Sequence, residues 1–220
     1  MKCVIFDLDG TLADTSGDLI EAANACFRTR GLGDLLDETK DRLTALRGGR
    51  AMLRLGFARS GREDEEAVER TFPEFLGRYR EVIDVRTVLF PGAVVAVDAL
   101  RDAGYRVGIC TNKPEALAEL LLCRLGVRDR FASLVGADTL PVRKPDPQAL
   151  LEAVTRASGN PARSMLVGDT ETDVRTARAA GVPVALVSFG PEGERVARLE
   201  PDALLPDFGA LGRIVAELIG

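Results

Sequence analysis

The chain has 220 residues, a formal net charge of −5 and no histidine. Without histidine, Ser-His-Asp and Cys-His chemistry and histidine-ligated zinc are excluded, so acid–base and metal chemistry must fall on carboxylates. The net negative charge gives no positive electrostatic field that would attract nucleic acid. No apolar run approaches the roughly 20 residues that a bilayer crossing needs. With no signal peptide and no metal-type spacing of the four cysteines, we expect a cytoplasmic protein that binds neither nucleic acid nor membrane.

The first predicted element is a buried strand over residues 2–7, which leads into two aspartates, Asp7 and Asp9. Side chains at i and i+2 of an extended chain point the same way, so both carboxylates would crowd one spot. Two neighbouring anions repel one another unless a cation neutralises them or one takes a proton. This indicates metal binding and covalent catalysis; in the plainer interpretation Asp9 and Gly10 form only a turn.

The region after this strand is strand-poor and carries helical patterns throughout. A helix start in Thr15-Ser16-Gly17-Asp18 is followed by apolar residues at helical spacing. A second, long and charged helix is predicted from Glu63 to Arg80, interrupted near Pro73. The predicted domains are therefore a core of residues 1–14 and 86–220 and an inserted helical domain of residues 15–85.

From about residue 86 onward strands and helices alternate, which predicts a parallel sheet with helices on both faces. The first strand must join the same sheet, because its apolar run needs cover on both sides. The fold class is thus α/β, a Rossmann-like parallel sheet with an inserted α-helical domain. The predicted strands cover residues 106–110, 132–136, 164–168, 183–187 and 203–205, and the helices residues 92–103, 114–125, 147–158, 171–180 and 207–219.

Further polar residues stand at the ends of these strands. Thr111 and Asn112 follow the strand at 106–110, and Asp169 follows the strand at 164–168. Ligands of an open parallel sheet bind at the carboxyl ends of its strands. We therefore expect Thr111 and Asp169 to converge with the two N-terminal aspartates on one site.

Each of these residues also has a plainer interpretation. Thr111 and Asn112 could merely open the helix that begins at Pro114. Lys144, which precedes the helix at 147–158, could be a solvated surface residue. Asp173 lies three residues after Thr170, at the spacing of a capping box.

The order of strand-end Asp-x-Asp, strand-end Thr, lysine and Gly-Asp-x-x-x-Asp resembles the four motifs of the haloacid dehalogenase superfamily of phosphohydrolases. Within it, the chain is most similar to the phosphoglycolate phosphatase group with a helical cap. The resemblance implies that Asp7 attacks phosphorus to form an aspartyl-phosphate, while Asp9 protonates the leaving oxygen and then activates water. It implies Mg²⁺ held by Asp7, the backbone carbonyl of Asp9 and Asp169, with Asp173 either a direct ligand or a residue that supports the ligands.

The same resemblance assigns the remaining motif residues. Lys144 would stabilise Asp7 and the phosphoryl charge, and Thr111 with Asn112 would bind phosphate at the start of a helix. A phosphoacceptor receiver module shares much of this chemistry, but it places its acceptor aspartate on a middle strand after the acidic pair. That alternative also leaves the helical insertion unexplained.

The substrate expectation depends on the inserted domain. The segment Leu46–Leu53 resembles the glycine-containing cap loop of phosphoglycolate phosphatases, with Arg50 where glycine is expected. Arg47, Gly48 and Arg50 could bring guanidinium groups and amides to a small carboxylate, or the segment could be only a turn with solvated arginines. We expect a small phosphorylated metabolite as substrate, 2-phosphoglycolate first, and a monomer or homodimer. A sugar-phosphate phosphatase, a β-phosphoglucomutase and a pyrophosphatase are the alternatives.

Overall fold

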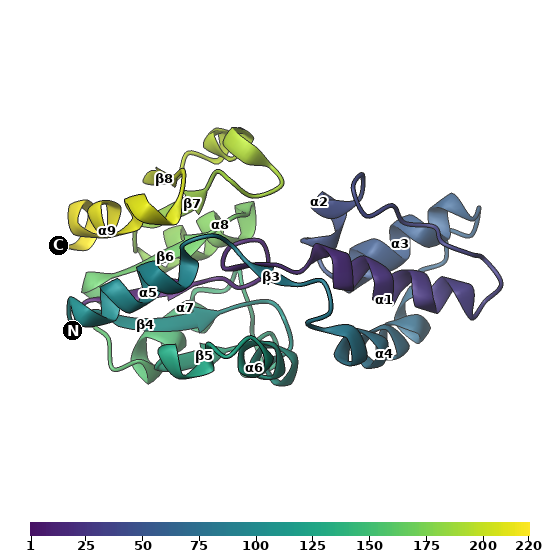
Figure 1. The fold of residues 1–220 in the computed structure, drawn as a ribbon, viewed down its shortest axis with the longest axis horizontal. Coiled ribbons are helices and arrows are strands. Elements are labelled where there is room, and N and C mark those ends of the chain that lie inside the picture. Colours follow the sequence, from purple (N-terminus) through teal and green to yellow (C-terminus); the bar gives the residue numbers. More distant parts are fainter. The chain divides into compact units, whose positions relative to one another are not determined.

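The computed structural model describes residues 1–220, which divide into two compact units (Figure 1). One unit, the core, consists of residues 1–13 and 89–220, and the other, the cap, of residues 14–88. The inserted domain expected at 15–85 lies within the cap. Two short strands, β2 (Ala13–Asp14) and β3 (Val88–Leu89), pair where the chain passes between the units.

The core is built on one six-stranded parallel sheet with the strand order β5-β4-β1-β6-β7-β8. The α/β fold class is confirmed, and every predicted strand is present to within one or two residues. The strands are β1 (Cys3–Phe6), β4 (Arg106–Cys110), β5 (Ser133–Val135), β6 (Ser164–Gly168), β7 (Val184–Val187) and β8 (Ala203–Leu205).

Helices cover both faces of this sheet, as the alternating pattern predicts (Figure 1). Alternate residues of β1 point to opposite faces, so that Cys3 and Ile5 join a buried cluster with the apolar sides of α7 and α8. The other face packs against α5 and α9. The core helices are α5 (Ala93–Asp102), α6 (Glu115–Arg124), α7 (Pro147–Arg156), α8 (Glu171–Ala180) and α9 (Leu211–Ile219), with 3₁₀ turns η1 (Arg128–Arg130), η2 (Pro161–Arg163), η3 (Gly193–Leu199) and η4 (Phe208–Ala210).

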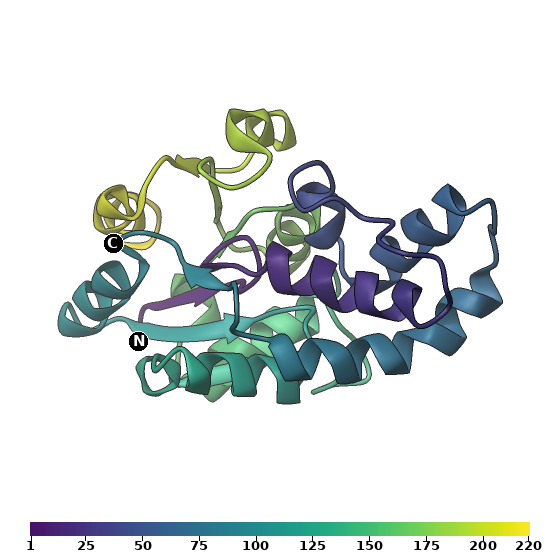
Figure 2. The ribbon, with the colours of Figure 1, turned by 45° about the vertical axis from the view of Figure 1, so that its right-hand side comes forward.

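Four helices form the cap, seen side on in Figure 2. They are α1 (Ser16–Arg28), α2 (Arg42–Ala45), α3 (Gly49–Arg59) and α4 (Glu65–Val82). The ring of Phe27 on α1 meets Phe57 on α3 edge-on at 5.4 Å. A Cβ at Gly56 would come within 2.1 Å of the Phe27 ring, so the close approach of α1 and α3 requires glycine there.

The predicted interruption near Pro73 is wrong, because α4 continues through that residue from Glu65 to Val82. Proline cannot donate to the carbonyl four residues earlier, which normally breaks a helix. Here Thr71 and Phe75 are buried on either side of Pro73 and anchor both halves of the helix in the cap. Packing therefore outweighs the local cost. Neither α4 nor any other helix combines the length and the apolar composition that a membrane crossing needs.

The cap segment 46–53 is not a single loop. The turn between α2 and α3 covers residues 46–48, and α3 begins at Gly49. Gly48 has φ of 90°, a left-handed conformation that favours glycine. Arg50 consequently lies in the first helical turn of α3.

The four cysteines are free, and three of them are buried. Burial raises the pKa of Cys3 and of Cys110 to about 12, so both stay protonated thiols at neutral pH. They contribute packing and no nucleophile.

Candidate active site

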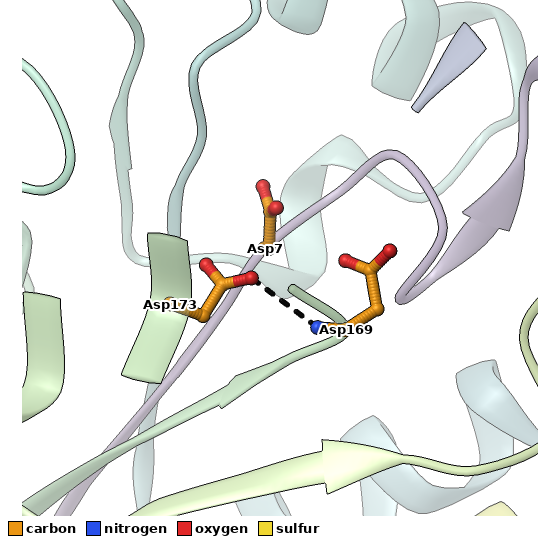
Figure 3. A group of neighbouring side chains, drawn as sticks. All are labelled: Asp7, Asp169 and Asp173. Atoms are coloured by element: carbon orange, nitrogen blue, oxygen red, sulfur yellow. Dashed lines mark hydrogen bonds between the residues drawn. The ribbon is translucent and has the colours of Figure 1, made fainter. Parts of the chain in front are cut away.

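Three aspartates meet at the carboxyl edge of the sheet (Figure 3). Asp7 follows β1, Asp169 follows β6, and Asp173 lies in the first turn of α8. Each offers one carboxylate oxygen, and these oxygens lie within 4.8 Å of one another. The register of the sheet explains the meeting, since Phe6 pairs with Val167 and the Asp7 amide donates to the Val167 carbonyl at 2.9 Å. The convergence expected from strand ends is therefore present for Asp7 and Asp169, and Asp173 joins them from the first turn of α8.

Asp7 is buried and held by two donors. Its Oδ1 accepts from the Leu8 amide at 2.8 Å, and its Oδ2 lies 3.1 Å from Nζ of Lys144. Burial raises the pKa of Asp7 to about 6; the charge of Lys144 opposes the shift, and those of Asp173 and Asp9 add to it. An additional cation at this position would favour the ionised carboxylate.

Lys144 bridges two carboxylates in the interior. Its side chain is 2% exposed, and Nζ lies 2.7 Å from Asp173 Oδ1 as well as 3.1 Å from Asp7 Oδ2. Burial alone would favour the neutral amine, but the two carboxylates hold the pKa of Lys144 above its ordinary value. The interpretation of Lys144 as a solvated surface residue is wrong.

Asp173 does two things at once. Its Oδ2 accepts from the Thr170 amide at 3.1 Å and the Thr170 hydroxyl at 2.7 Å, which completes the expected capping box at the start of α8. The same oxygen accepts from the Asp169 amide at 3.2 Å, drawn as the dashed line in Figure 3. Because Oδ1 also holds Lys144, Asp173 organises its neighbours as well as capping the helix.

Gly168 explains why glycine precedes this pair of aspartates. A Cβ at Gly168 would lie 2.4 Å from Cγ of Asp173 and 2.6 Å from its Oδ2. Any larger residue would push the Asp173 carboxylate away from Lys144 and from the start of α8. The glycine of the Gly-Asp-x-x-x-Asp motif thus follows from a packing requirement.

Asp169 is held by a residue that the sequence interpretation missed. The hydroxyl of Thr11 donates to Asp169 Oδ1 at 3.0 Å, and both residues are buried. Burial raises the pKa of Asp169 well above its ordinary value, with Asp173 and Asp7 adding to the shift and Thr11 and Lys144 opposing it. The available signal was the hydroxyl residue two positions after Asp9.

Asp9 is not a member of this trio of aspartates. Its Oδ1 lies 2.8 Å from Nζ of Lys113, whose side chain is 3% exposed. Lys113 is the second residue that the sequence interpretation missed, although it is one of only four lysines and follows Thr111 and Asn112 directly.

Thr111 and Asn112 connect the end of β4 with the segment of Lys144. The buried Thr111 hydroxyl accepts from the Lys113 amide at 3.2 Å, and Nδ2 of Asn112 donates to the Lys144 carbonyl at 3.0 Å. The helix α6 begins at Glu115 with Pro114 as its N-cap, one residue later than expected. The strand-end residues of β1, β4 and β6 and Lys144 thus gather at one edge of the sheet.

The three cap residues singled out in the sequence are not alike. Arg50 forms a bidentate pair with Glu69 through Nε at 2.6 Å and Nη2 at 2.9 Å, and its guanidinium lies 3.6 Å from the centre of the Phe72 ring. Arg47 is exposed, forms no ion pair and stands beside the left-handed Gly48. The Arg50 guanidinium is therefore already paired within the cap, whereas the Arg47 guanidinium has no ion-pair partner there.

Carboxylate oxygens are the ligands of hard divalent cations, and Mg²⁺ is bound by one or two carboxylates together with water and phosphate oxygens. Asp169 has one carboxylate oxygen beyond that engaged by Thr11, and each Asp7 oxygen has a single donor, Leu8 or Lys144, which leaves it a further lone pair. The Asp173 oxygens already accept four hydrogen bonds. The cluster can hold a cation between Asp7 and Asp169, with a buried ammonium beside it for a second anionic group.

Comparisons with known proteins agree with this arrangement. Residues 1–181 match the family model described as haloacid dehalogenase-like hydrolase. A phosphoglycolate phosphatase of Mesorhizobium japonicum is 39% identical over 97% of this chain and 94% of its own length. That of Xanthomonas campestris pv. campestris is 42% identical over 86% of this chain and 84% of its own.

The fold has solved counterparts as well. The crystal structure of a predicted phosphoglycolate phosphatase from Haemophilus somnus 129pt superposes with a TM-score of 0.82 at 24% identity, covering 97% of each chain. At that identity the likeness concerns the fold.

Proposed function

The chain belongs to the haloacid dehalogenase-like hydrolase family and is a phosphomonoester hydrolase, and from this premise we propose that it hydrolyses 2-phosphoglycolate through Asp7. The observation that carries the proposal is the buried Asp7 carboxylate, held between Lys144 and two further aspartates at the carboxyl edge of the sheet. A phosphatase needs a nucleophile, positioned positive charge and an acid–base group, and each has a candidate here.

Asp7 is the proposed nucleophile. The Leu8 amide fixes one carboxylate oxygen and Lys144 the other, which supports a single orientation of the attacking group. Attack of Asp7 on phosphorus forms the aspartyl-phosphate and expels the alcohol oxygen of the substrate. Lys144 would offset the charge that gathers on the phosphoryl oxygens, and Thr111 with Asn112 would orient them.

Asp9 is the proposed acid–base group. It would give a proton to the leaving oxygen in the first step and take one from water in the second. The contact between Asp9 and Lys113 supports a fixed direction of this carboxylate. Since the chain has no histidine, no imidazole competes for the role.

Mg²⁺ is the proposed cofactor, with Asp7, the backbone carbonyl of Asp9 and Asp169 as its protein ligands. The buried cluster of carboxylates fits a hard cation, whereas no sulfur or imidazole donor lies among them. When bound, the ion neutralises charge on the nucleophile and on the phosphate. Asp173 would not bind the ion directly but would hold Lys144 and the Asp169 amide in place.

The substrate follows from the relatives and from the cap. Curated relatives 36–42% identical to this chain are named phosphoglycolate phosphatases. Arg47, with no ion-pair partner in the cap, is the proposed contact for the carboxylate of a short substrate, whereas the Gly48 amide already donates to the Ala45 carbonyl at 2.9 Å. Arg50 is the weaker candidate, because Glu69 already occupies its fork. The four free cysteines support a reducing compartment, the cytoplasm, as the place of the reaction.

The mechanism is tested by turnover and by trapping. Asp7→Asn should abolish phosphate release and also the radiolabelled phosphoenzyme that acid quenching traps from the unmodified protein. Asp9→Asn should lower kcat by about 10²–10⁴-fold while the protein still binds substrate. EDTA should stop the reaction and Mg²⁺ restore it. Wild-type rates in Asp7→Asn would refute the covalent mechanism.

The substrate is tested by a panel with phosphate detection. 2-Phosphoglycolate should give the highest kcat/KM, ahead of sugar phosphates, inorganic pyrophosphate and p-nitrophenyl phosphate. Arg47→Ala should lower kcat/KM for 2-phosphoglycolate about tenfold or more and leave p-nitrophenyl phosphate unchanged, while Arg50→Ala should affect both little. Conversion of β-glucose 1-phosphate with little phosphate release would instead favour a mutase. A flat panel would leave a phosphatase of another specificity.

A further inference from the structure

A cavity of about 260 Å³ lies entirely within the cap, at the end of the helices remote from the two points where the chain enters and leaves it. One side of the cavity is lined by Arg30, two residues after α1 ends at Arg28. The other sides are lined by residues near the end of α3 and at the beginning of α4. Because α1 starts at Ser16 and rises about 1.5 Å per residue, its far end lies roughly 20 Å from its start. None of the residues proposed for catalysis lines this cavity.

The lining combines a buried floor with a cationic rim. Phe57 and Thr71 are 3% and 1% exposed and form the floor. Three arginines, Arg30, Arg62 and Arg70, come from three different segments of the cap and stand around it. An aromatic ring beside several guanidinium groups suits a ligand with an apolar body and an anionic head.

The three arginines have donors left for such a ligand. Arg62 forms no ion pair with any residue of the chain, although it borders the cavity. Arg30 makes all of its hydrogen bonds, to Cys26, Thr29 and Glu74, through Nη1, so Nε and Nη2 are not engaged. Arg70 pairs with Glu66 and lies a loose 3.6 Å from Asp64.

The one acid that lines the cavity is already occupied. Asp64 is the N-cap of α4, and its Oδ1 accepts from the Ala67 amide at 3.1 Å. Its charge therefore serves the helix start, where an anion is favoured. The unpaired charge at the rim is that of Arg62, which is positive.

We propose that this cavity binds a small organic anion, a phosphate- or phosphonate-type head group on a short apolar body. The head group would lie between Arg62 and the free edge of Arg30, and the body would lie against Phe57. The volume is just below the roughly 300–1,000 Å³ of sites for drug-sized ligands, which fits a metabolite-sized one. Bound there, the ligand joins α1, α3 and α4 and stabilises the cap. This site is separate from the proposed function and does not depend on it.

The probe is phenylphosphonate, whose C–P bond is not a phosphoester, titrated into the full-length protein in EDTA. Without a divalent cation the core cluster is anionic, so binding there is disfavoured. Calorimetry gives the dissociation constant, and the arginine Nε–H resonances in nitrogen-15 NMR locate the ligand. We expect saturable binding, with shifts at Arg62 and Arg30, and at a hundred times the dissociation constant an approximately hundredfold larger folded-to-unfolded ratio in a thermal melt.

Three variants decide the matter. Arg62→Ala should weaken phenylphosphonate binding at least about tenfold, because one charge-assisted pair is lost. Ala67→Leu leaves every charge in place but fills the cavity that Ala67 lines, and it should also weaken binding. Arg80→Ala is the matched control, an exposed arginine of the cap without an ion pair at the opposite end of α4, and it should bind like the wild type.

Inorganic phosphate, titrated in the same way, separates the head group from the body. It should shift the same arginine resonances with a larger dissociation constant, since it lacks the contact with Phe57. Equal binding by Arg62→Ala and Arg80→Ala, shifts confined to residues of the core, or no binding at all would overturn the proposal.

Discussion

The charged side chains of the site in the core and the ion pairs on the cap differ in their burial. In the core, Lys144 and Lys113 are almost completely buried, and each lies against carboxylates of the site. In the cap, arginines such as Arg50 and Arg54 pair with glutamates in the solvent. Burial makes each of these charges of the site depend on its neighbours, whereas solvent screens the exposed cap pairs and makes them nearly independent.

This difference in burial indicates which charged residues of the chain can be substituted and which cannot. A buried carboxylate cluster with compensating lysines cannot lose one member without leaving another charge unpaired. An exposed arginine can change its partner or its identity at little cost. The core is thus suited to one fixed chemistry, and the cap to variation in what it recognises.

The largest expected effect comes from removing a buried ammonium. Lys144→Met leaves the carboxylates of Asp7 and Asp173 without their common counter-charge, and we expect the unfolding free energy to fall by about 3–5 kcal/mol in EDTA. Urea denaturation followed by circular dichroism measures this. Mg²⁺ should return part of the loss, because it supplies positive charge at the same edge of the sheet. An unchanged unfolding midpoint would mean that the lysine does not balance these charges.

A matched pair of glycines compares the two units directly. Gly168→Ala forces a methyl group against Asp173 and should destabilise the core by about 1–3 kcal/mol. Gly77→Ala, in the middle of α4 with no atom within 4 Å of the new Cβ, should stabilise the cap by about 0.5–1 kcal/mol. Thermal melts of the two variants should therefore move in opposite directions, and shifts of the same sign would contradict the packing assigned to Gly168.

The cap also contains a buried, paired carboxylate, Asp41, and its contribution to stability should depend on pH. The buried Asp41 accepts two hydrogen bonds from Arg59, at 2.6 Å and 2.8 Å, which hold its pKa below the ordinary value. A carboxyl with a depressed pKa in the folded state contributes stability above its unfolded pKa of about 3.9, and the contribution disappears as the pH falls through the folded value. Asp41→Asn should be less stable than the wild type by about 1 kcal/mol at pH 7, and the difference should shrink below pH 4. A difference that stays constant with pH would rule out this linkage.

The smallest effect is expected at the exposed pair of Arg50 and Glu69. Both side chains are more than a third exposed, so their attraction is screened by solvent. Arg50→Ala should move the melting temperature by less than about 2 °C, even though the pair is bidentate. A larger loss would indicate that stacking on Phe72 carries the contact, and Phe72→Leu would then lower the melting temperature by a similar amount.

The sequence predicted the sheet well because each strand is a short run rich in apolar residues, and β1, β4 and β6 are each followed directly by a polar residue. The run at 164–168 and the aspartate after it could be located without knowing any partner strand. The continuity of α4 through Pro73 could not, because the local cost of proline is visible in the sequence while the packing of Phe75 is not.

The position of the site could be predicted from the sequence, but several of its side-chain pairings could not. The meeting of Asp7 and Asp169 follows from the rule that parallel strands share a carboxyl edge. The pairing of Asp9 with Lys113 and of Thr11 with Asp169 depends on side-chain directions across segments about 100 and 160 residues apart, which no local pattern specifies. The commitment of Arg50 to Glu69 likewise required the packing of α3 on α4.

The pairing of β2 with β3 has a consequence for the history of such a chain. Residues 13–14 and 88–89 lie side by side, so the whole cap leaves and rejoins the core at neighbouring points. A segment whose two ends nearly touch can be lengthened, shortened or replaced by recombination without stretching the strands that flank it. The cap is in this sense an exchangeable cassette, and a gene encoding the core could acquire a new specificity in one insertion while every residue of its carboxylate cluster is inherited unchanged.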